Sequence, residues 1–482
     1  MRLSTKTGLP LYTPLAAGDV TRIDDAAKEL LERVGIKLRD ERHLEILGKA
    51  GARVDHESGR VSFERDWLAH VVGKAPSGFV LCSRDGTRDL HLGEGSVHFS
   101  NGGRVFRILD LEKGGYRYSL LRDVAATASL VQQLEYLDFY IIACQAHNVG
   151  PEAYHLNDFC HAFNHTTKHV MGGCTNLDGA RQMWRIASFI AGGEDKLRER
   201  PFVSAITNPL SPLTLESETL DTIEFCVQRG IPVTCAPAPM AGATSPATLA
   251  GTLAQMHAEA LAGVAVSQVL CPGAKVLYGA VATAMDLRRM ELTMGSVEST
   301  MMNAAAVQLA KLHGLPIYAS AGVSEAKRPN IQAGLEKAFS NLMVGSAGAD
   351  CVHLAVGMLD SGNSIAYEQF VIDNEVIGMV QRVLSGIEVN EGTLGLDTVE
   401  QVGPGGNYVM EDHTIEHMMD EFFYPKLSVR CNFDTWEEQG RPDMLSRAAE
   451  SATRLLEEAR AGLLDPDTIE RIREAFPAII KL

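Results

Sequence analysis

The chain of 482 residues is long enough to bury a large core, and its 45% hydrophobic and 22% charged residues are typical of a globular protein. Its formal net charge of −17 argues against nucleic-acid binding, which favours a basic surface, and would attract a cationic substrate or a basic partner. Nine scattered cysteines without a CxxC pair predict reduced thiols, and the N-terminus lacks the apolar segment of a secretory signal. We therefore expect a cytoplasmic protein that neither binds nucleic acid nor spans a membrane.

Residues 1–95 are expected to form an appended layer of helix and β-structure. Asp24 and Asp25 are of the type that opens helices, and apolar residues follow them at helical spacing: Ala27, Leu30, Leu31 and Val34. A β-rich stretch then extends to about Tyr118.

Residues 96–386 alternate between short apolar segments and helical patterns. The apolar segments are predicted strands: Val97–Asn101, Phe139–Cys144, His169–Gly173, Phe202–Thr207, Pro232–Pro237, Lys275–Ala282, Pro316–Gly322 and Cys351–Met358. The helical patterns lie between and after them: Leu121–Leu134, Leu156–Asn164, Gly179–Ile190, Glu216–Gln228, Pro246–Leu270, Val297–His313, Gln332–Val344 and Glu368–Leu384. Eight such units predict an α/β fold with a closed (β/α)8 TIM barrel. A doubly wound open sheet is the competing architecture, which the absence of a nucleotide-binding fingerprint disfavours.

Residues 387–482 are predicted to form a mostly helical segment that packs on the barrel. Its last two helices are expected at Met444–Gly462 and Asp467–Phe476. On a predicted helix of this segment, His413 and His417 are four residues apart and, with Glu416, form an HxxEH pattern that resembles an inverted zinc-protease motif. Because five residues match by chance and no third ligand is evident, we interpret the pair as structural.

In a (β/α)8 barrel, chemistry is carried at the carboxyl ends of the strands. The residues expected there are mostly polar or aromatic: Phe99, Asn101, Gln145, His147, Thr175, Asn176, Thr207, Asn208, Thr283, Asp286, Gly322, Ser324, Glu325, His353 and Met358. No three metal ligands fall on neighbouring strand ends, so no metal site is predicted, and a metal-dependent hydrolase is a weak alternative.

The segment Ser324-Glu-Ala-Lys-Arg-Pro-Asn-Ile-Gln-Ala-Gly-Leu-Glu-Lys337 closely resembles the trimethylamine methyltransferase superfamily. The family pattern there is Ser-Asp/Glu-Ala-Lys-x-Pro-Asp-x-Gln-Ala-Gly-x-Glu-Lys, from which Asn330 departs. Three further stretches are similar to the family: 245–253, 272–279 and 368–374. Members that act on trimethylamine carry pyrrolysine two residues before the serine, where this chain has Gly322. The resemblance therefore implies a non-pyrrolysine member.

That resemblance implies a methyltransferase for a quaternary amine, glycine betaine first, with dimethylglycine as product. Proline betaine, carnitine and γ-butyrobetaine are alternative substrates. The methyl acceptor would be Co(I) of a cognate corrinoid protein, so this chain is expected to bind no cofactor tightly and to supply no catalytic nucleophile of its own. A non-catalytic betaine-binding protein is the alternative from another class. A homo-oligomer is also expected.

The substrate is expected to lie near Gly322, with an aromatic cage around its ammonium group. Five residues in or just past strand ends are the predicted cage: Phe99, Tyr140, Tyr278, Tyr367 and Phe370. Polar contacts, including a hydrogen-bond donor for the substrate's carboxylate, are assigned to His353, Asn208 and Gln369. Glu325 and Lys327 are expected to form a structural ion pair.

Overall fold

The computed structural model describes residues 12–110, 113–459 and 462–480, and its centre is a barrel of eight parallel strands. In chain order these are β6 (His98–Asn101), β9 (Tyr140–Ile141), β10 (Val170–Gly173), β11 (Val203–Thr207), β13 (Val233–Cys235), β15 (Val276–Ala280), β18 (Ile317–Ser320) and β19 (Cys351–Val356). Each strand pairs with the next, β19 pairs with β6, and a bridge between Ser100 and Phe139 joins β6 to β9. The predicted TIM barrel is confirmed.

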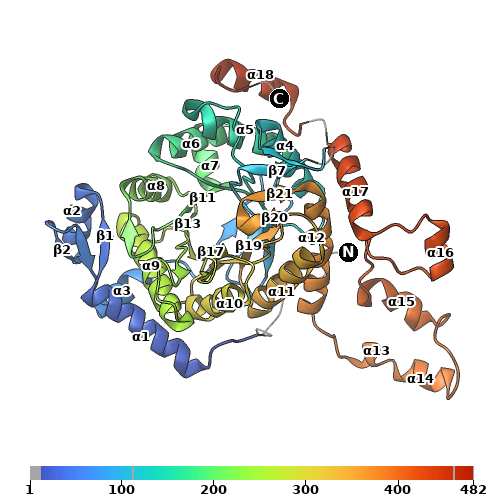
Figure 1. Cartoon of the computed structure of the whole chain (residues 1–482). Helices are drawn as coiled ribbons and strands as arrows, with labels where there is room; N and C mark the ends of the chain where they lie inside the picture. Colours follow the sequence, from blue (N-terminus) through green and yellow to red (C-terminus); the bar gives the residue numbers. More distant parts are fainter. Residues whose placement is uncertain (1–11, 111–112, 460–461, 481–482) are drawn as a thin grey trace.

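A helix follows each strand and surrounds the barrel, as Figure 1 shows. These helices are α4 (Leu121–Gln133), α5 (Tyr154–His165), α6 (Leu177–Ala191), α8 (Ser217–Val227), α9 (Leu249–Leu270), α10 (Val297–Leu312), α11 (Ile331–Ala347) and α12 (Tyr367–Leu384), with a short α7 (Glu194–Glu199) after α6. All eight coincide with the predicted helical patterns. Helix α9 is buried on nearly every side because the N-terminal layer covers its outer face.

The N-terminal layer contains helices α1 (Ala17–Arg33), α2 (Glu41–Lys49) and α3 (Arg65–Val72). Its small sheet joins β1 (Ile36–Leu38), β2 (Arg53–Asp55) and β3 (Arg60–Ser62) to β12 (Thr214–Leu215), which follows barrel strand β11. The prediction that a helix opens at Asp24 is wrong. Helix α1 begins two turns earlier, since Val20 and Ile23 extend its buried face, and Asp24 is itself buried within the helix.

A hairpin of β4 (Val80–Leu81) and β5 (Leu90–His91) closes the amino-terminal end of the barrel. Leu81, Leu90 and Leu92 pack with inward-facing strand residues into a separate apolar cluster inside the barrel. His169, at the start of β10, bonds the Cys82 carbonyl through Nδ1 at 2.9 Å. Side chains therefore fill the barrel at the amino-terminal ends of its strands. The cavity of the described structure lies toward their carboxyl ends.

Two small sheets form the rim at the carboxyl end. One contains β7 (Arg107–Leu109), β8 (Tyr116–Tyr118), β20 (Met358–Leu359) and β21 (Ser364–Ala366), and the other contains β14 (Met240–Ala241), β16 (Thr283–Asp286) and β17 (Glu291–Thr293). Short 3-10 turns at Pro151–Ala153 and Asp360–Gly362 complete the rim.

The C-terminal segment divides into two parts. Helix α17 (Met444–Glu458) packs against α12 and α4, and α18 (Pro466–Ala475) reaches α6, where Phe476 meets Phe189. Helices α13 (Glu391–Leu394), α14 (Leu396–Val402), α15 (Asp412–Glu421) and α16 (Phe433–Glu438) extend away from the barrel in Figure 1. Helices α17 and α18 thus make the extended packing contacts with the barrel helices, and Glu421 at the end of α15 pairs with Arg382 of α12 at 3.1 Å. No helix in the described ranges is long and apolar enough to cross a membrane.

Candidate active site at the barrel mouth

A cavity of about 250 Å³ lies at the carboxyl ends of the barrel strands. Its wall combines apolar side chains with a few polar groups, and includes Arg104, Ile141, Ile206, Asn208, Val281, Met294, Tyr318, His353, Met358 and Ser361. The volume suits a small molecule. The lining contains no cysteine, lysine or carboxylate side chain.

Strand alternation decides which side chains reach this cavity. On β9, Ile141 faces the cavity while Tyr140 turns outward, and its hydroxyl lies 2.9 Å from Thr127 Oγ1 of α4. On β15, Tyr278 likewise turns outward, with its hydroxyl 2.8 Å from His257 Nδ1 of α9. Because successive strand residues point to opposite faces, neither tyrosine can contact a molecule in the barrel.

The cavity has one aromatic wall. The rings of Tyr318 on β18 and His353 on β19 stack with centroids 3.8 Å apart and an interplanar angle of 13°. His353 Nε2 lies 2.7 Å from Ser320 Oγ, whose own hydroxyl donates to the Ala280 carbonyl at 3.1 Å. The tautomer of His353 decides which of the two groups donates, and Nε2 is engaged with Ser320 in either case.

Burial lowers the pKa of His353 to about 3, so the ring is neutral at physiological pH. Its Nε2 is engaged with Ser320, so Nδ1 is the ring nitrogen that remains for a ligand. The prediction that His353 donates a hydrogen bond to an anionic group requires the Nδ1–H tautomer, in which Ser320 donates to Nε2. The ring can instead present its face to a cation.

Arg104 is the charged side chain in the cavity lining, and the sequence analysis did not single it out. It follows Gly102 and Gly103 after β6 and has a φ of +57°, a conformation that L-residues other than glycine seldom adopt. Such strain concentrates at functional sites. The sequence did contain a signal for this residue, because a charged side chain directly after a barrel strand and a glycine pair lies where barrel active sites are built.

The guanidinium of Arg104 is fixed by three hydrogen bonds. It donates to the Tyr154 hydroxyl, to the Gly173 carbonyl and to His155 Nδ1, the last at 3.1 Å. It also lies over the Tyr154 ring, 4.9 Å from the centroid. The Nε atom of Arg104 is buried beside Gly173 and has no hydrogen-bond partner. The cavity wall therefore holds an immobile positive charge with one unused donor.

Behind Arg104, helix α5 carries two buried titratable groups. Burial, aided by the Arg104 charge, lowers the pKa of His155 to about 3, and its Nε2 lies 2.9 Å from Thr175 Oγ1. Burial raises the pKa of Asp158 to about 7 even though the Arg104 charge acts to lower it. Asp158 also interacts with the Tyr154 hydroxyl, and this contact acts to lower its pKa. Asp158 is thus the group near Arg104 whose charge changes close to neutral pH.

Of the predicted site residues, the structure brings only Asn208 and His353 to the cavity. In the orientation that satisfies its amide, Asn208 donates to the Ala236 carbonyl at 3.2 Å. Phe99 is outside the barrel lumen, where its ring meets Gly345 of α11. Besides Tyr140 and Tyr278, three predicted residues on α12 also lie elsewhere.

Those three residues are buried between α12 and its neighbours. Tyr367 donates its hydroxyl proton to Asp123 at 2.6 Å, and Gln369 donates to Asp373 at 2.7 Å. The Phe370 ring packs beside Gly357. They were predicted because they follow the last barrel strand, but the rim strands β20 and β21 intervene and place α12 on the outside.

Gly322 also does not line the cavity. Its φ is +76°, and a Cβ atom built on it would lie within 2.6 Å of three backbone atoms of Ala355. Its amide donates to Ser340 at 2.9 Å, and its carbonyl accepts from the buried Lys337, which pairs with Asp373 at 3.0 Å. In this backbone arrangement, residue 322 must be glycine and contributes no side-chain space to a ligand.

The expected ion pair between Glu325 and Lys327 is not present. Lys327 pairs with Asp360 in the rim turn, and Glu325 accepts from the Gly295 amide at 2.8 Å. Both contacts tie the Ser324–Lys337 segment to neighbouring loops. Asn330 caps α11 by accepting from the Ala333 amide at 3.0 Å.

Two groups of His and carboxylate side chains in the described ranges are close enough to hold a metal ion, and neither lies at the barrel mouth. They are Asp24, His257 and His313, and Asp40, His43 and Asp221. His413 and His417 belong to neither group. Their rings lie 4.4 Å apart on the exposed helix α15, and His413 Nε2 contacts the Gly392 carbonyl.

Comparison with known proteins agrees with this barrel. A family model described as trimethylamine methyltransferase (MTTB) matches residues 3–478. The trimethylamine methyltransferase MttB of Desulfitobacterium hafniense is 34% identical over 435 residues, which are 90% of this chain and 87% of that protein. The glycine betaine methyltransferase of D. hafniense strain Y51 is 29% identical over 472 residues, 98% and 97% of the two chains.

A solved structure also has this fold. The monomethylamine methyltransferase MtmB of Methanosarcina barkeri matches with a TM-score of 0.50 at 13% sequence identity. The match covers 95% of this chain and 96% of that one. At this identity, the likeness concerns the fold alone.

Proposed function

The chain belongs to the trimethylamine methyltransferase (MTTB) family, and from this premise we propose that it demethylates a quaternary amine that carries a carboxylate, glycine betaine first. The methyl group passes to Co(I) of a separate corrinoid protein that docks at the barrel mouth. The carbon–nitrogen bond breaks with its electron pair going to nitrogen, so the products are dimethylglycine and a methyl–Co(III) group.

The observation that carries this proposal is the fixed charge of Arg104. A substrate that is only a cation, such as protonated trimethylamine or tetramethylammonium, would be repelled by a guanidinium in a small cavity. A betaine has a carboxylate as well, which the positive charge of Arg104 in the cavity wall attracts. The residue therefore favours a zwitterion.

The aromatic wall suits the other end of the same molecule. The outer face of the stacked Tyr318–His353 pair can lie against a trimethylammonium group, a contact that contributes about 2 kcal/mol in a desolvated site. The leaving tertiary amine needs no proton, which is consistent with a lining that offers no carboxylic acid. The chain's own task is then to bind and align the substrate and to exclude water.

The test is a methyl-transfer assay with the purified chain, reduced corrinoid protein and a panel of amines. We expect glycine betaine to give methyl–Co(III), seen by its absorption spectrum, together with an equal amount of dimethylglycine. Proline betaine, carnitine and γ-butyrobetaine belong in the panel as alternatives. Calorimetric binding of a betaine without any methyl transfer would favour the non-catalytic binding protein. Turnover of trimethylamine but of no quaternary amine would contradict the proposal.

Arg104→Gln supplies the sharper variant. We expect the KM for glycine betaine to rise about 10- to 100-fold, the loss of one charge-assisted hydrogen bond of roughly 1.5–3 kcal/mol, with a smaller change in kcat. Binding of tetramethylammonium should not weaken, because that cation lacks the carboxylate. Arg107→Gln, three residues further along the chain in β7 and outside the cavity lining, is the control. An unchanged KM in the Arg104 variant would show that Arg104 does not bind the substrate's carboxylate.

A further inference from the structure

A buried cluster of one carboxylate and two imidazoles lies where the N-terminal layer meets the barrel. Asp24 belongs to α1, His257 to the middle of α9, and His313 directly follows α10. These three helices pack side by side, as Figure 1 shows. Asp24 Oδ1 lies 3.1 Å from His257 Nε2 and 2.8 Å from His313 Nε2. Both imidazoles therefore direct the same ring nitrogen at a single carboxylate oxygen.

The separations in this cluster match those of ligands around a metal ion. Zinc binds imidazole nitrogen and carboxylate oxygen at about 2.0–2.2 Å in tetrahedral sites, which places neighbouring ligand atoms about 3.3 Å apart. The two distances from Asp24 Oδ1 are within about 0.5 Å of that value, and the three ligand atoms lie within 4.8 Å of one another. Two histidines and one carboxylate are also a donor set that zinc accepts.

The surroundings of His257 fix its ring as a metal ligand requires. Its Nδ1 lies 2.8 Å from the hydroxyl of Tyr278 on β15. With a metal ion on Nε2, the imidazole proton is on Nδ1, where the Tyr278 oxygen can accept it. A hydrogen-bond partner behind the ligating ring sets both its tautomer and its orientation.

Lys28 is the cation that contacts Asp24 in the described structure. Its Nζ lies 2.6 Å from Oδ2, so it does not use the oxygen that both histidines approach. The side chains of Lys28 and His313 are 20% and 13% exposed, whereas those of Asp24 and His257 are almost fully buried. An ion therefore has a path from solvent along Lys28 and His313, and the lysine can turn outward as the ion binds.

The second group of histidine and carboxylate side chains already contains a permanent cation. Arg42 Nη2 lies 2.9 Å from Asp221 Oδ1 and 3.4 Å from His43 Nε2. A guanidinium stays protonated in proteins, so it competes with a metal ion for these ligands at every pH.

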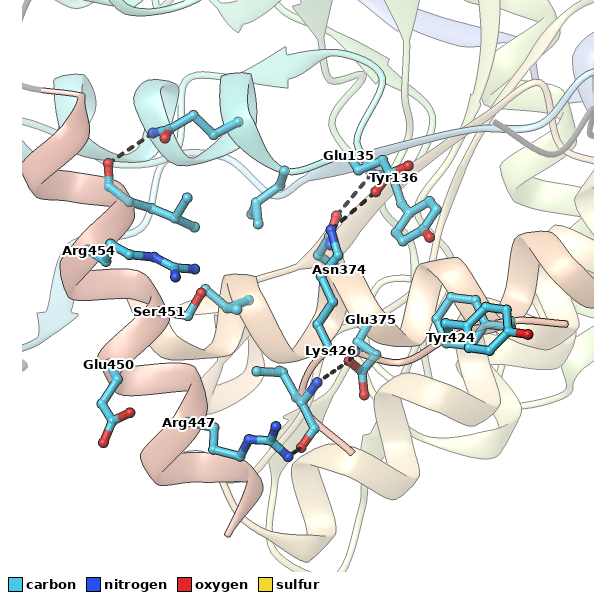
Figure 2. A pocket seen from close by; sticks show the side chains of 16 residues that line it. Glu135, Tyr136, Asn374, Glu375, Tyr424, Lys426, Arg447, Glu450, Ser451 and Arg454 are labelled. Atoms are coloured by element: carbon cyan, nitrogen blue, oxygen red, sulfur yellow. Dashed lines mark hydrogen bonds and ion pairs between the residues drawn. The ribbon is translucent and has the colours of Figure 1, made fainter. Parts of the chain in front are cut away.

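A groove of about 450 Å³ between α12, α17 and residues 423–427 also gathers charged side chains, as Figure 2 shows. Glu375 there accepts from the amides of Lys426 and Leu427 at 2.7 and 2.6 Å, and Arg447 donates to the Leu427 carbonyl at 2.8 Å. These groups hold the chain's own backbone and do not converge on one point as the Asp24 cluster does.

We propose that Asp24, His257 and His313 bind a divalent transition-metal ion, zinc first, with water as the fourth ligand. The ion joins α1 of the N-terminal layer to α9 and α10 of the barrel, so its binding stabilises the folded chain. It takes no part in methyl transfer, because His257 and Tyr278 meet on the helix side of β15, outside the cavity lining. Asp24 is 233 residues from His257 and 289 from His313, so no local motif predicts the site.

Metal analysis of the full chain tests the proposal. After dialysis against zinc sulfate and then metal-free buffer, elemental analysis should find one zinc ion per chain, and Co²⁺ in its place should give the visible absorption of a tetrahedral site. His313→Gln should weaken zinc binding by more than about 100-fold, since loss of a mere hydrogen-bond partner of a ligand costs about 10–100-fold. His43→Gln and His417→Gln change the other two histidine clusters, and these controls should bind zinc like the wild type.

Lys28→Met separates a metal site from a cluster that only forms hydrogen bonds. The substitution keeps all three ligands and removes a positive charge near the ion, so zinc affinity should rise about tenfold. Its thermal midpoint should increase with the logarithm of the zinc concentration, and the midpoint of His313→Gln should not respond. A chain that retains no zinc, or zinc binding that His313→Gln leaves intact, would overturn the proposal. Loss of the ion from His43→Gln or His417→Gln instead would overturn it as well, by placing the ion in another cluster.

Discussion

The carboxyl group of Asp158 should make substrate binding sensitive to pH. Its pKa is raised to about 7, chiefly by burial, and it interacts with the charge of Arg104. Below this pKa the carboxyl group is neutral, so the Arg104 guanidinium interacts with the carboxylate of a bound substrate alone. Above it, the Asp158 anion competes for that charge and repels the substrate carboxylate. Affinity for glycine betaine should therefore fall as pH rises through 7.

Calorimetric titration with glycine betaine measures this effect without the corrinoid partner. We expect the Kd to be about tenfold higher at pH 8.5 than at pH 5.5, which corresponds to a one-unit shift of the Asp158 pKa by the bound carboxylate. In Asp158→Asn the Kd should be independent of pH over this range. Asp195→Asn, on the exposed helix α7, should keep the wild-type dependence. If the Kd of the Asp158→Asn protein kept the pH dependence of the wild type, another group would be its cause.

At the residue scale, the sequence predicted the location of the site better than its members. It placed the site at the strand ends and included Asn208 and His353, which reach the cavity. The sequence could not show that Tyr318 faces the cavity while Tyr278 faces the helices. Parallel barrel strands are apolar on both faces, so their sequences do not alternate between polar and apolar residues. Arg104 was missed because it lies three residues beyond β6, outside the segment that was treated as the strand end.

Gly322 and Gly314 allow a test at the scale of an element, since both lie beside strand β18 with positive φ. The values are +76° and +62°, but a Cβ at 314 would meet no atom within 4 Å, whereas one at 322 would collide with the Ala355 backbone. Gly314→Ala should cost about 1–2 kcal/mol of backbone strain. Gly322→Ala should cost well beyond this, because two strand ends must separate to admit the methyl group.

Scanning calorimetry should show the difference. At about 2.1 cal/mol/K of unfolding entropy per residue, each kcal/mol corresponds to about 1 °C of thermal midpoint for a chain of 482 residues. We expect a decrease of about 1–2 °C for Gly314→Ala and a several-fold larger decrease, or loss of soluble protein, for Gly322→Ala. Equal decreases in the two variants would mean that the backbone at Ala355 moves aside for the added methyl group at little cost in free energy.

The barrel elements were predictable because each strand and helix has a strong local pattern. The start of α1 was placed late because Asp24 resembles a helix-opening residue, whereas its partners are His257 and His313, which are more than 200 residues away. The rim strands β20 and β21 have two or three residues each and leave no periodic signal. Long-range partners and very short elements are the parts that a local pattern cannot contain.

On the scale of the whole molecule, the three predicted segments do not have separate cores. One continuous cluster of buried side chains extends from Val20 in α1 through the barrel to Phe476 at the end of α18. The exception is the segment 387–443, of which only Leu427 belongs to this cluster. The N-terminal layer is therefore expected to unfold together with the barrel, and the contacts between them should govern global stability.

Asp24 is the polar centre of that junction. Its Oδ1 accepts from His313 Nε2 at 2.8 Å and from His257 Nε2 at 3.1 Å, and its Oδ2 accepts from Lys28 at 2.6 Å. Burial acts to raise the pKa of Asp24, but these three hydrogen bonds outweigh it and hold the pKa well below the usual value of 3.8. The carboxylate thus joins α1 to α9 and to the end of α10.

Asp24→Ala should therefore lower the thermal midpoint strongly, while Asp25→Ala next to it should not. Removing Asp24 leaves two histidines and a lysine without their shared acceptor, a loss of about 3–5 kcal/mol. Asp25 is exposed and pairs only with Arg65 at 3.3 Å, a contact worth less than about 1 kcal/mol. Because the folded pKa of Asp24 is depressed, its stabilisation is complete above pH 3.8 and is lost as the pH falls below that value. The difference between the two variants should accordingly be present at neutral pH, and equal midpoints there would show that α1 is held by apolar packing alone.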